Sequence, residues 1–485
     1  PEFQAAKEEL YKAALALDLE QNEFRNTFQA MLSGDYSLDL SGGEDVGFAG
    51  HSSDLSISRK FMTGVEFTSR LALDIASLLT QDRGSAFGVA ADAGIAIPLL
   101  RGSGRKIVGE PLKQSWRNLL YEVRRFERFK RTFAVDIGQR YLGVLEEYQQ
   151  TQYVAENYER LKAASRRARR LAESGRLPGF QYDQAVQDEL RARARLITAR
   201  QRYARNFDEF KVDMGLPPDA VVSLDNNELQ RLKTDTNRVD LSIGETEPSA
   251  SETETLSGAG TSIGGAFEIP YSEAVRVALA SRLDLKTVAD RVEDAQRKIY
   301  VAQDRLRGEL TFMGEARAGG RRNTVGSVDS GDAKLDFGEG SLGGLLTLDL
   351  PLERTKERNA YRNELINLQQ AVRDYQQLED RVKLQVMNVL RDLVEARETM
   401  VNQSKAVTLA TKRVESTDLL LQAGRAAVRD VLEAEESLLS VQNALTTAIV
   451  NYRTAEWRLQ RDMGVLEVSE KGIWKEYEPK RNDQQ

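Results

Sequence analysis

The chain has 485 residues, of which 41% are hydrophobic, and 68 basic against 75 acidic side chains give a net charge of −7. This negative balance argues against general nucleic-acid binding. The sequence has no cysteine, which excludes disulfides, thiolate metal sites and cysteine nucleophiles. The only histidine, His51, lies in a Gly- and Ser-rich stretch that we predict to be an exposed loop. We therefore expect no catalytic site, no bound metal and no cofactor.

The sequence contains no run of apolar residues long enough for a membrane-spanning helix. A membrane β-barrel is not excluded, because its strands alternate lipid-facing and lumen-facing residues and leave a weak hydropathy signal. The chain begins at Pro1 without a signal-like run, so we expect a mature form or a fragment.

In chain order, an N-terminal helix is expected first, followed by strands with a period of two. Residues 35–40 place Tyr36, Leu38 and Leu40 on one face. Residues 86–99 alternate in the same way, with small or charged side chains on the opposite face. The apolar face of this stretch carries Phe87, Val89, Ala91, Ala93, Ile95, Ile97 and Leu99.

Segments rich in Gly, Ser and Asp separate the predicted strands and read as loops at 42–53, 80–85 and 319–340. Two further alternating stretches, 55–61 and 65–75, flank Thr63 and Gly64. They predict an inserted hairpin in the first half of the chain only, and its place in the sheet is left open.

A long helix is predicted from Pro111, a residue typical of a first helical turn, to residue 174. A glycine tip follows, and a return helix runs over 180–214. A polar segment over 225–265 then separates the two halves of the chain. These elements predict a long antiparallel helical hairpin.

The second half repeats this order. Leu310 and Phe312 alternate with polar residues, and 346–352 places leucines at every second position. Residues 352–423 contain no Gly or Pro, and a helix of 72 residues would span about 108 Å, too long for a globular core. After a second tip, the return helix over 425–463 carries a heptad seam, made of Val431, Ala434, Leu438, Val441, Leu445, Ala448, Tyr452, Ala455 and Leu459.

The two hairpins are copies of each other. Residues 175–215 align without a gap with 424–464, at an offset of 249, and 11 of 41 positions are identical. A repeat of this kind indicates one supersecondary unit used twice. The predicted fold class is mostly α with β, a duplicated unit of strands plus a very long helical hairpin. We place the first repeat at 1–220, a polar linker at 221–268, the second repeat at 269–467 and a C-terminal tail at 468–485.

This order of elements resembles the TolC-like family of outer-membrane efflux proteins. The resemblance is carried by the sequence IPLLRGSGR at 97–105, by LPLER at 350–354 and by GRAAVRDVLEA at 424–434. It covers residues 1 to about 467. It implies a homotrimer whose strands share one barrel in the outer membrane and whose helices form a periplasmic tunnel closed at the tips.

The resemblance also implies the functional residues. The tips at Gly175, Arg176, Gly424 and Arg425 are expected to contact a periplasmic adaptor. Acidic residues past the second tip line the tunnel entrance in that family, and by position these are Asp430 and Glu433, three apart on one helix face. Three copies would form two carboxylate rings. The first copy departs from this pattern, with glutamines at 181 and 184.

The expected function is a passive export conduit of a tripartite efflux pump or a type I secretion system, opened by an adaptor and an inner-membrane transporter. The alternative is an elongated periplasmic adaptor or a coiled-coil scaffold, which has no need of lipid-compatible strands in both copies. Outer-membrane lipid is expected to contact one face of the strands, at Phe87, Val89, Ile95, Ile97, Leu346, Leu348 and Leu350.

Overall fold

The computed structural model describes residues 2–39, 46–79, 84–225, 229, 231–232, 267–328, 330–338, 340–350, 352–469, 474–475 and 477. Most of the predicted polar linker, Pro351 and most of the predicted C-terminal tail lie outside these residues. The chain divides into two compact units, and each of the two predicted repeats contributes to both. We call 4–126 with 286–376 the strand unit, and 1–3 with 127–285 and 377–485 the helical unit.

The predicted order of helix, strands, long helix, tip and return helix is confirmed in both halves. The helices of the first half are α1 (Glu2–Asn22), α2 (Arg105–Val108), α3 (Glu110–Glu173) and α4 (Gly179–Asp213). Those of the second half are α6 (Tyr271–Ser281), α7 (Leu283–Asp304), α9 (Thr355–Gln422) and α10 (Val428–Met463). In the described residues, none of these helices combines the length and the apolarity needed to cross a membrane.

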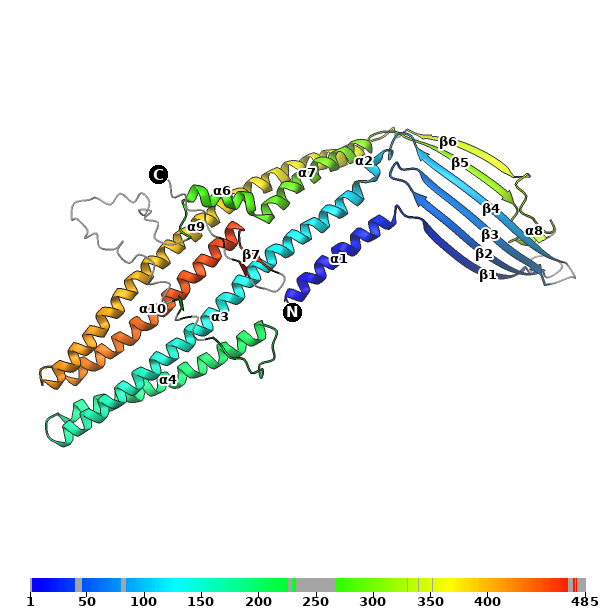
Figure 1. Ribbon diagram of the computed structural model, residues 1–485. Coiled ribbons are helices and arrows are strands. Elements are labelled where there is room, and N and C mark those ends of the chain that lie inside the picture. Colours follow the sequence, from blue (N-terminus) through cyan, green and yellow to red (C-terminus); the bar gives the residue numbers. More distant parts are fainter. Residues whose placement is uncertain are drawn as a thin grey trace. The chain divides into compact units, whose positions relative to one another are not determined.

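The strand unit is built on one six-stranded antiparallel sheet in simple chain order (Figure 1). Its strands are β1 (Thr27–Asp39), β2 (Val46–Lys60), β3 (Glu66–Leu78), β4 (Ser85–Pro98), β5 (Glu309–Gly319) and β6 (Ser341–Asp349). The predicted inserted hairpin is confirmed as β2 and β3, and the sheet order places it between β1 and β4. The pairing of β4 with β5 joins the two copies, and β1 and β6 form the two edges.

The sheet register separates two faces of opposite character. Leu55 lies opposite Leu71, which lies opposite Ala91, so apolar residues continue from strand to strand on one face. We call this the apolar face; it carries Phe28, Leu32, Tyr36, Leu55, Phe67, Leu71, Leu73, Ile75, Phe87, Val89, Ile95, Ile97, Phe312, Leu346 and Leu348. The opposite face, the polar face, is dominated by Asp, Ser, Thr, Gly and Ala.

Three details of the strand prediction were wrong. The predicted loop over 42–53 is strand from Val46 onward, because the ladder with β1 continues to Val46 and the ladder with β3 to Phe48. His51 therefore lies in β2 instead of a loop, exposed, with its Nε2 3.1 Å from the hydroxyl of Ser53. Leu350 and Leu352 fall beyond the end of β6, since the ladder with β5 stops at Asp349.

The predicted loop at 319–340 is partly structured, and it packs against the polar face of the sheet. It contains the short helix α8 (Val325–Val328). Val328 is buried there in a small apolar cluster with Phe48, Ala76, Leu78 and Ala86. This contact covers part of the polar face near the start of β4.

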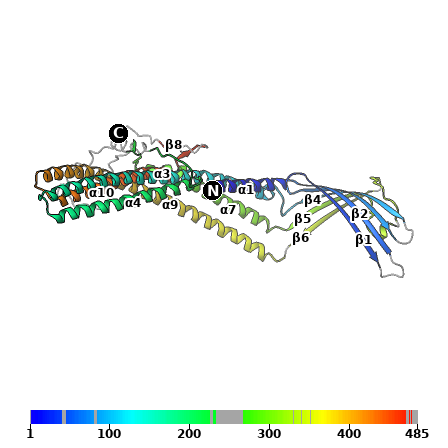
Figure 2. The same ribbon diagram turned by 90° about the horizontal axis from the view of Figure 1, so that it is seen from below.

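The helical unit consists of two antiparallel hairpins, α3 with α4 and α9 with α10, which lie side by side (Figure 1, Figure 2). The predicted heptad seam is confirmed, since Ala434, Leu438, Tyr452 and Leu459 are all buried. A large apolar cluster joins α6, α9 and α10, and a smaller one joins α3, α4 and α10. A two-stranded ladder of β7 (Glu467–Val468) and β8 (Trp474–Lys475) follows α10.

Candidate functional site

The two hairpin tips have the same backbone geometry. At the first tip Gly175 has a φ of +73°, its N–H donates to Ala172 O at 3.0 Å, and Arg176 N–H donates to Leu171 O at 2.9 Å. At the second tip Gly424 has a φ of +72°. Its N–H donates to Leu421 O, and Arg425 N–H donates to Leu420 O. This is the Schellman ending, in which a left-handed residue satisfies the last helical carbonyls. Both tip glycines, Gly175 and Gly424, and both arginines, Arg176 and Arg425, are exposed.

The same motif closes the far end of both return helices and explains part of the sequence repeat. Gly215 has a φ of +77° and Gly464 a φ of +75°, and the residues after them donate to Lys211 O and Gln460 O. Two of the eleven identical positions between the copies are thus occupied by positive-φ glycines in both copies. A side chain is disfavoured in this conformation, so the backbone accounts for the identity of these glycines.

Asp430 caps the first turn of α10. Its Oδ2 accepts a hydrogen bond of 2.8 Å from the backbone N–H of Ala427, the residue that precedes the helix. The corresponding residue of the first copy is Gln181, and the residue that precedes α4 is Pro178. Because proline has no N–H to donate, the first copy has no need of an acid at this position. The difference between the copies therefore has a local structural basis.

Glu433 lies one turn further along α10 and pairs across the second hairpin. Its Oε1 is 3.3 Å from Nη2 of Arg413 on α9, and both side chains are more than half exposed. An exposed pair of this kind contributes only about 0–1 kcal/mol to stability. The structure thus places Asp430 and Glu433 on the exposed side of one helical turn, where both carboxylates remain accessible to cations.

The region behind the tips holds the two hairpins together. Val428 and Leu432 of α10 are buried against Leu161 and Ala168 of α3 and against Ala185 of α4. Polar contacts reinforce this packing, with Arg160 at 2.6 Å from Glu435 and Arg167 at 2.7 Å from Asp418. The exposed tip residues therefore lie next to a packed contact between the two hairpins.

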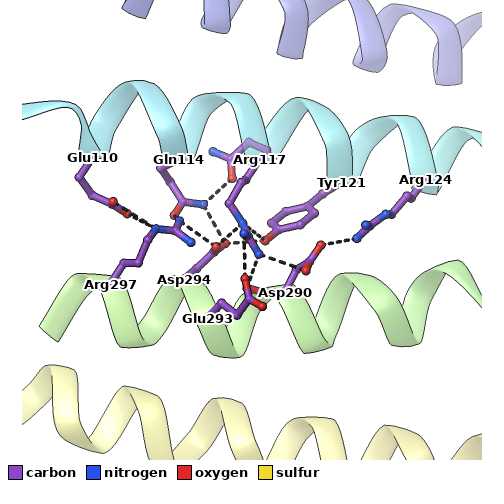
Figure 3. Close-up of polar contacts among 10 residues, drawn as sticks. Glu110, Gln114, Arg117, Tyr121, Arg124, Asp290, Glu293, Asp294 and Arg297 are labelled. Atoms are coloured by element: carbon purple, nitrogen blue, oxygen red, sulfur yellow. Dashed lines mark hydrogen bonds and ion pairs between the residues drawn. The ribbon is translucent and has the colours of Figure 1, made fainter. Parts of the chain in front are cut away.

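A second conspicuous cluster lies in the strand unit, where α3 and α7 run antiparallel (Figure 3). Arg117 is at its centre, with Nε 2.5 Å from Asp294, Nη1 3.1 Å from Glu293 and Nη2 3.2 Å from Asp290. Only 11% of the Arg117 side chain and 6% of the Asp294 side chain are exposed. The cluster continues in both directions, through Arg124 with Asp290 at 2.6 Å and Arg297 with Glu110 at 3.0 Å.

The cluster is a structural clamp between helices and not a site of proton transfer. The Tyr121 hydroxyl donates to Asp294 at 2.6 Å and accepts from Arg117 at 3.1 Å. Burial raises the pKa of Tyr121 to about 12, so the hydroxyl remains protonated at physiological pH. Burial alone would lower the pKa of Arg117, but the bond to Tyr121 and the charges of Asp294 and Asp290 outweigh it and raise that pKa. Arg117 is therefore a cation held between three acidic side chains of α7.

Sequence reasoning missed this cluster. Its members are polar residues on faces of α3 and α7 whose composition predicts exposure to solvent. The two helices belong to different copies, so no local sequence pattern links them. In the part of the chain that the structure describes, no group of three or more His, Asp or Glu side chains is arranged to hold a metal ion.

The architecture of this chain is similar to that of several solved structures. No model of a known protein family matches the chain, and no curated protein sequence matches it. The outer-membrane protein VceC of Vibrio cholerae is 14% identical, with a TM-score of 0.62 over 95% of this chain and 92% of that one. CusC is 12% identical with a TM-score of 0.64, over 96% and 89% of the two chains. The open-state MtrE channel of Neisseria gonorrhoeae is 13% identical with a TM-score of 0.61, over 96% and 86%.

The chain has the fold of the TolC-like outer-membrane channels. The resemblance inferred from the sequence is thereby confirmed for the fold. At 12–14% identity the function has to be argued from the residues themselves.

Proposed function

We propose that this TolC-like chain is the outer-membrane channel-tunnel of a tripartite efflux pump or a type I secretion system. It would act as a passive export conduit, opened by a periplasmic adaptor and an inner-membrane transporter. The observation that carries this proposal is the six-stranded sheet with one continuous apolar face and one polar face, attached to very long helical hairpins.

The sheet supports residence in lipid. Side chains such as Leu71, Phe87 and Leu346 remain about 40–60% exposed on the apolar face, an arrangement that water does not favour over so wide a surface. A sheet in a bilayer must also satisfy the backbone of its edge strands, because lipid offers no hydrogen-bond partners. Pairing β1 of one protomer with β6 of the next would satisfy both edges.

The helical unit supports an oligomer. Large apolar side chains are exposed along its helices, at Phe180, Leu190, Ile197, Leu384, Leu409 and Leu419. Packing between protomers would cover them, as the hydrophobic effect favours. Following the resemblance, we propose a homotrimer with one shared barrel in the outer membrane and a periplasmic tunnel of helices.

The experiment that tests the proposal is extraction of the protein from membranes in detergent, followed by native mass measurement. The expected result is recovery from the outer-membrane fraction as a trimer. Recovery as a soluble monomer would contradict the proposal and favour the alternative, a periplasmic adaptor or coiled-coil scaffold. The broad apolar face of the sheet argues against that alternative.

We further propose that the tips at Gly175, Arg176, Gly424 and Arg425 dock the adaptor. Replacing Gly424 with Phe should abolish export while the amount of folded trimer changes little. A built Cβ at Gly424 meets no atom within 4 Å, so the phenylalanine would project from the tip into the docking surface. The measurement is export of a substrate in cells, with trimer quantified in the same membranes.

Gly215 provides the matched control for this substitution. It has the same Schellman geometry, a φ of +77° and equally open space around a built Cβ, but it lies at the opposite end of α4. Gly215→Phe imposes the same backbone strain, about 1–2 kcal/mol, without altering a tip. Equal export by the two variants would contradict the proposal that the tips dock the adaptor.

Asp430 and Glu433 are proposed to form acidic rings at the tunnel entrance. The isosteric double variant Asp430→Asn with Glu433→Gln should reduce cation selectivity and any block by trivalent cations in planar bilayers. Six crowded carboxylates repel one another, and a bound cation relieves this repulsion. The Asn side chain retains an oxygen for the Ala427 N–H, so the helix cap is preserved.

The glutamines of the first copy serve as the control for the acidic rings. Gln181→Ala with Gln184→Ala changes the equivalent turn of α4 without removing charge and should leave selectivity unchanged. If the isosteric double variant of the acids also kept the original cation selectivity and block by trivalent cations, the ring proposal would be wrong. Asp430 would then serve only as a helix cap, and Glu433 only as a member of a surface ion pair.

A further inference from the structure

The segment that follows β5 does not lead directly into β6 but folds back over the polar face of the sheet. We call residues 320–328 and 330–338 the covering segment. Gly320 N–H donates to Val89 O at 3.0 Å, and Ala333 N–H donates to Phe87 O at 2.8 Å. In return, Phe87 N–H donates to the carboxylate of Asp332 at 2.7 Å. The segment thus bonds to the part of β4 that β5 no longer reaches.

A buried charge cluster fixes the start of this segment. Arg321 binds Asp74 of β3 with two bonds, of 2.8 and 2.9 Å, and also reaches Asp54 of β2 at 3.1 Å. The backbone N–H of Arg322 adds a further bond of 3.0 Å to Asp74. The Asp74 side chain is completely buried, and a charge so buried requires paired geometry of this quality. Two-point binding by arginine also fixes the direction in which the segment leaves β5.

Shape complementarity holds the segment flat against the sheet. A Cβ added at Gly88 would lie 2.6 Å from the backbone nitrogen of Arg322, so the segment passes directly over a residue without a side chain. Further along, Val328 is buried against Phe48 and Ala76. Gly88, Phe48, Ala76, Asp54 and Asp74 all lie on the polar face.

The covered part of the polar face is at the end of the sheet far from the helices. The β2–β3 turn marks the helical end, since a Cβ at Gly64 would lie 2.8 Å from the carbonyl of Gly102, just before α2. The covering segment instead contacts the last residues of β3 and the first residues of β4. In the proposed channel this is the outer mouth.

We infer that the covering segment lies inside the barrel near its outer mouth, where it sets the size limit for molecules that pass, and that Arg321 is the residue that holds it there. This inference rests on the proposed function, which places the apolar face in lipid and the polar face in the lumen. Three six-stranded sheets would supply eighteen strands, and barrels of 16–18 strands enclose an aqueous channel. An inward segment from each protomer would narrow such a channel.

The test uses single introduced cysteines, which are unique because the chain has none. Ala76→Cys lies beneath Val328 and reports release of the segment. Thr68→Cys lies on the same strand and face, exposed and nearer the helices, and reports which reagents enter the lumen. Both are labelled in the purified trimer with maleimides that carry polyethylene glycol chains of increasing size.

We expect Arg321→Ala to speed the labelling of Ala76→Cys by at least tenfold, and to admit larger reagents to Thr68→Cys. A second variant replaces 323–337 with a short Gly-Ser turn and keeps Arg321 with both aspartates. It should admit larger reagents in the same way, and it provides the test if Arg321→Ala fails to assemble. Arg317→Ala, on an exposed side chain at the end of β5, is the control and should leave both readouts unchanged.

The outcomes separate this inference from the proposed function. A size limit at Thr68→Cys that is the same in the parent, the turn variant and Arg321→Ala would overturn the inference while leaving the channel intact. Labelling of Thr68→Cys by every reagent in the parent protein would mean that the segment sets no size limit and would also overturn the inference, whereas failure of the proposed function would appear as recovery of a monomer instead of a trimer.

Discussion

Leu348→Arg should severely reduce the yield of assembled trimer, whereas Thr347→Arg should reduce it little. Leu348 lies on the apolar face of β6, opposite Leu310, while its neighbour Thr347 lies on the polar face opposite Thr311. A charge that faces lipid near the midplane costs about 2–4 kcal/mol, and a trimer incurs this cost three times. The measurement is the amount of trimer in detergent extracts of the outer membrane, relative to total protein expressed.

Thr347→Arg is the matched control, because it introduces the same side chain into the same strand one residue away. It would meet acidic neighbours on the polar face, Glu309 and Asp349, which favour a cation. Equal trimer yields from the two variants would contradict the assignment of the apolar face to lipid.

Arg117→Ala is expected to destabilise the strand unit by about 3–5 kcal/mol, the usual consequence of removing one partner from a buried ion cluster. Asp294 and Asp290 would lose a paired cation, and the side chain of Asp294 is almost fully buried. The measurement is the midpoint of thermal or urea unfolding, followed by helical circular dichroism.

Arg125→Ala is the control for this prediction, since it removes an arginine from the same helix. The Arg125 side chain is 75% exposed and pairs with Glu122 at 3.5 Å, so its loss should change stability by less than about 1 kcal/mol. Comparable midpoints for the two variants would mean that the cluster in Figure 3 contributes no more than an ordinary surface pair.

Most elements of the fold could be predicted from the sequence because each leaves a local pattern. The absence of Gly and Pro over 352–423 predicted α9, and alternation over 86–99 predicted β4 to within one residue at each end. Glycines at 175 and 424 marked the tips because only their left-handed backbone closes the helices. These signals depend on residues close together in the chain.

The features that could not be predicted depend on contacts between distant residues. The extension of β2 back to Val46 follows from pairing with β1 and β3, although Gly47, Gly50 and Ser52 give this stretch the composition of a loop. The covering segment has a loop composition as well, and contacts with residues on other strands, such as the buried Asp74, fix its position. At the tips the sequence indicated Asp430 and Glu433, but the capping bond to Ala427 and the pair with Arg413 required coordinates.

The contact between α3 and α7 also ties the two copies to each other. Arg117 belongs to the first copy and its carboxylate partners, Asp290 and Asp294, to the second. A change of charge at this contact in either copy would leave a buried partner in the other copy unpaired, at a large cost in stability. Only paired substitutions, one in each half of the chain, would therefore preserve the contact.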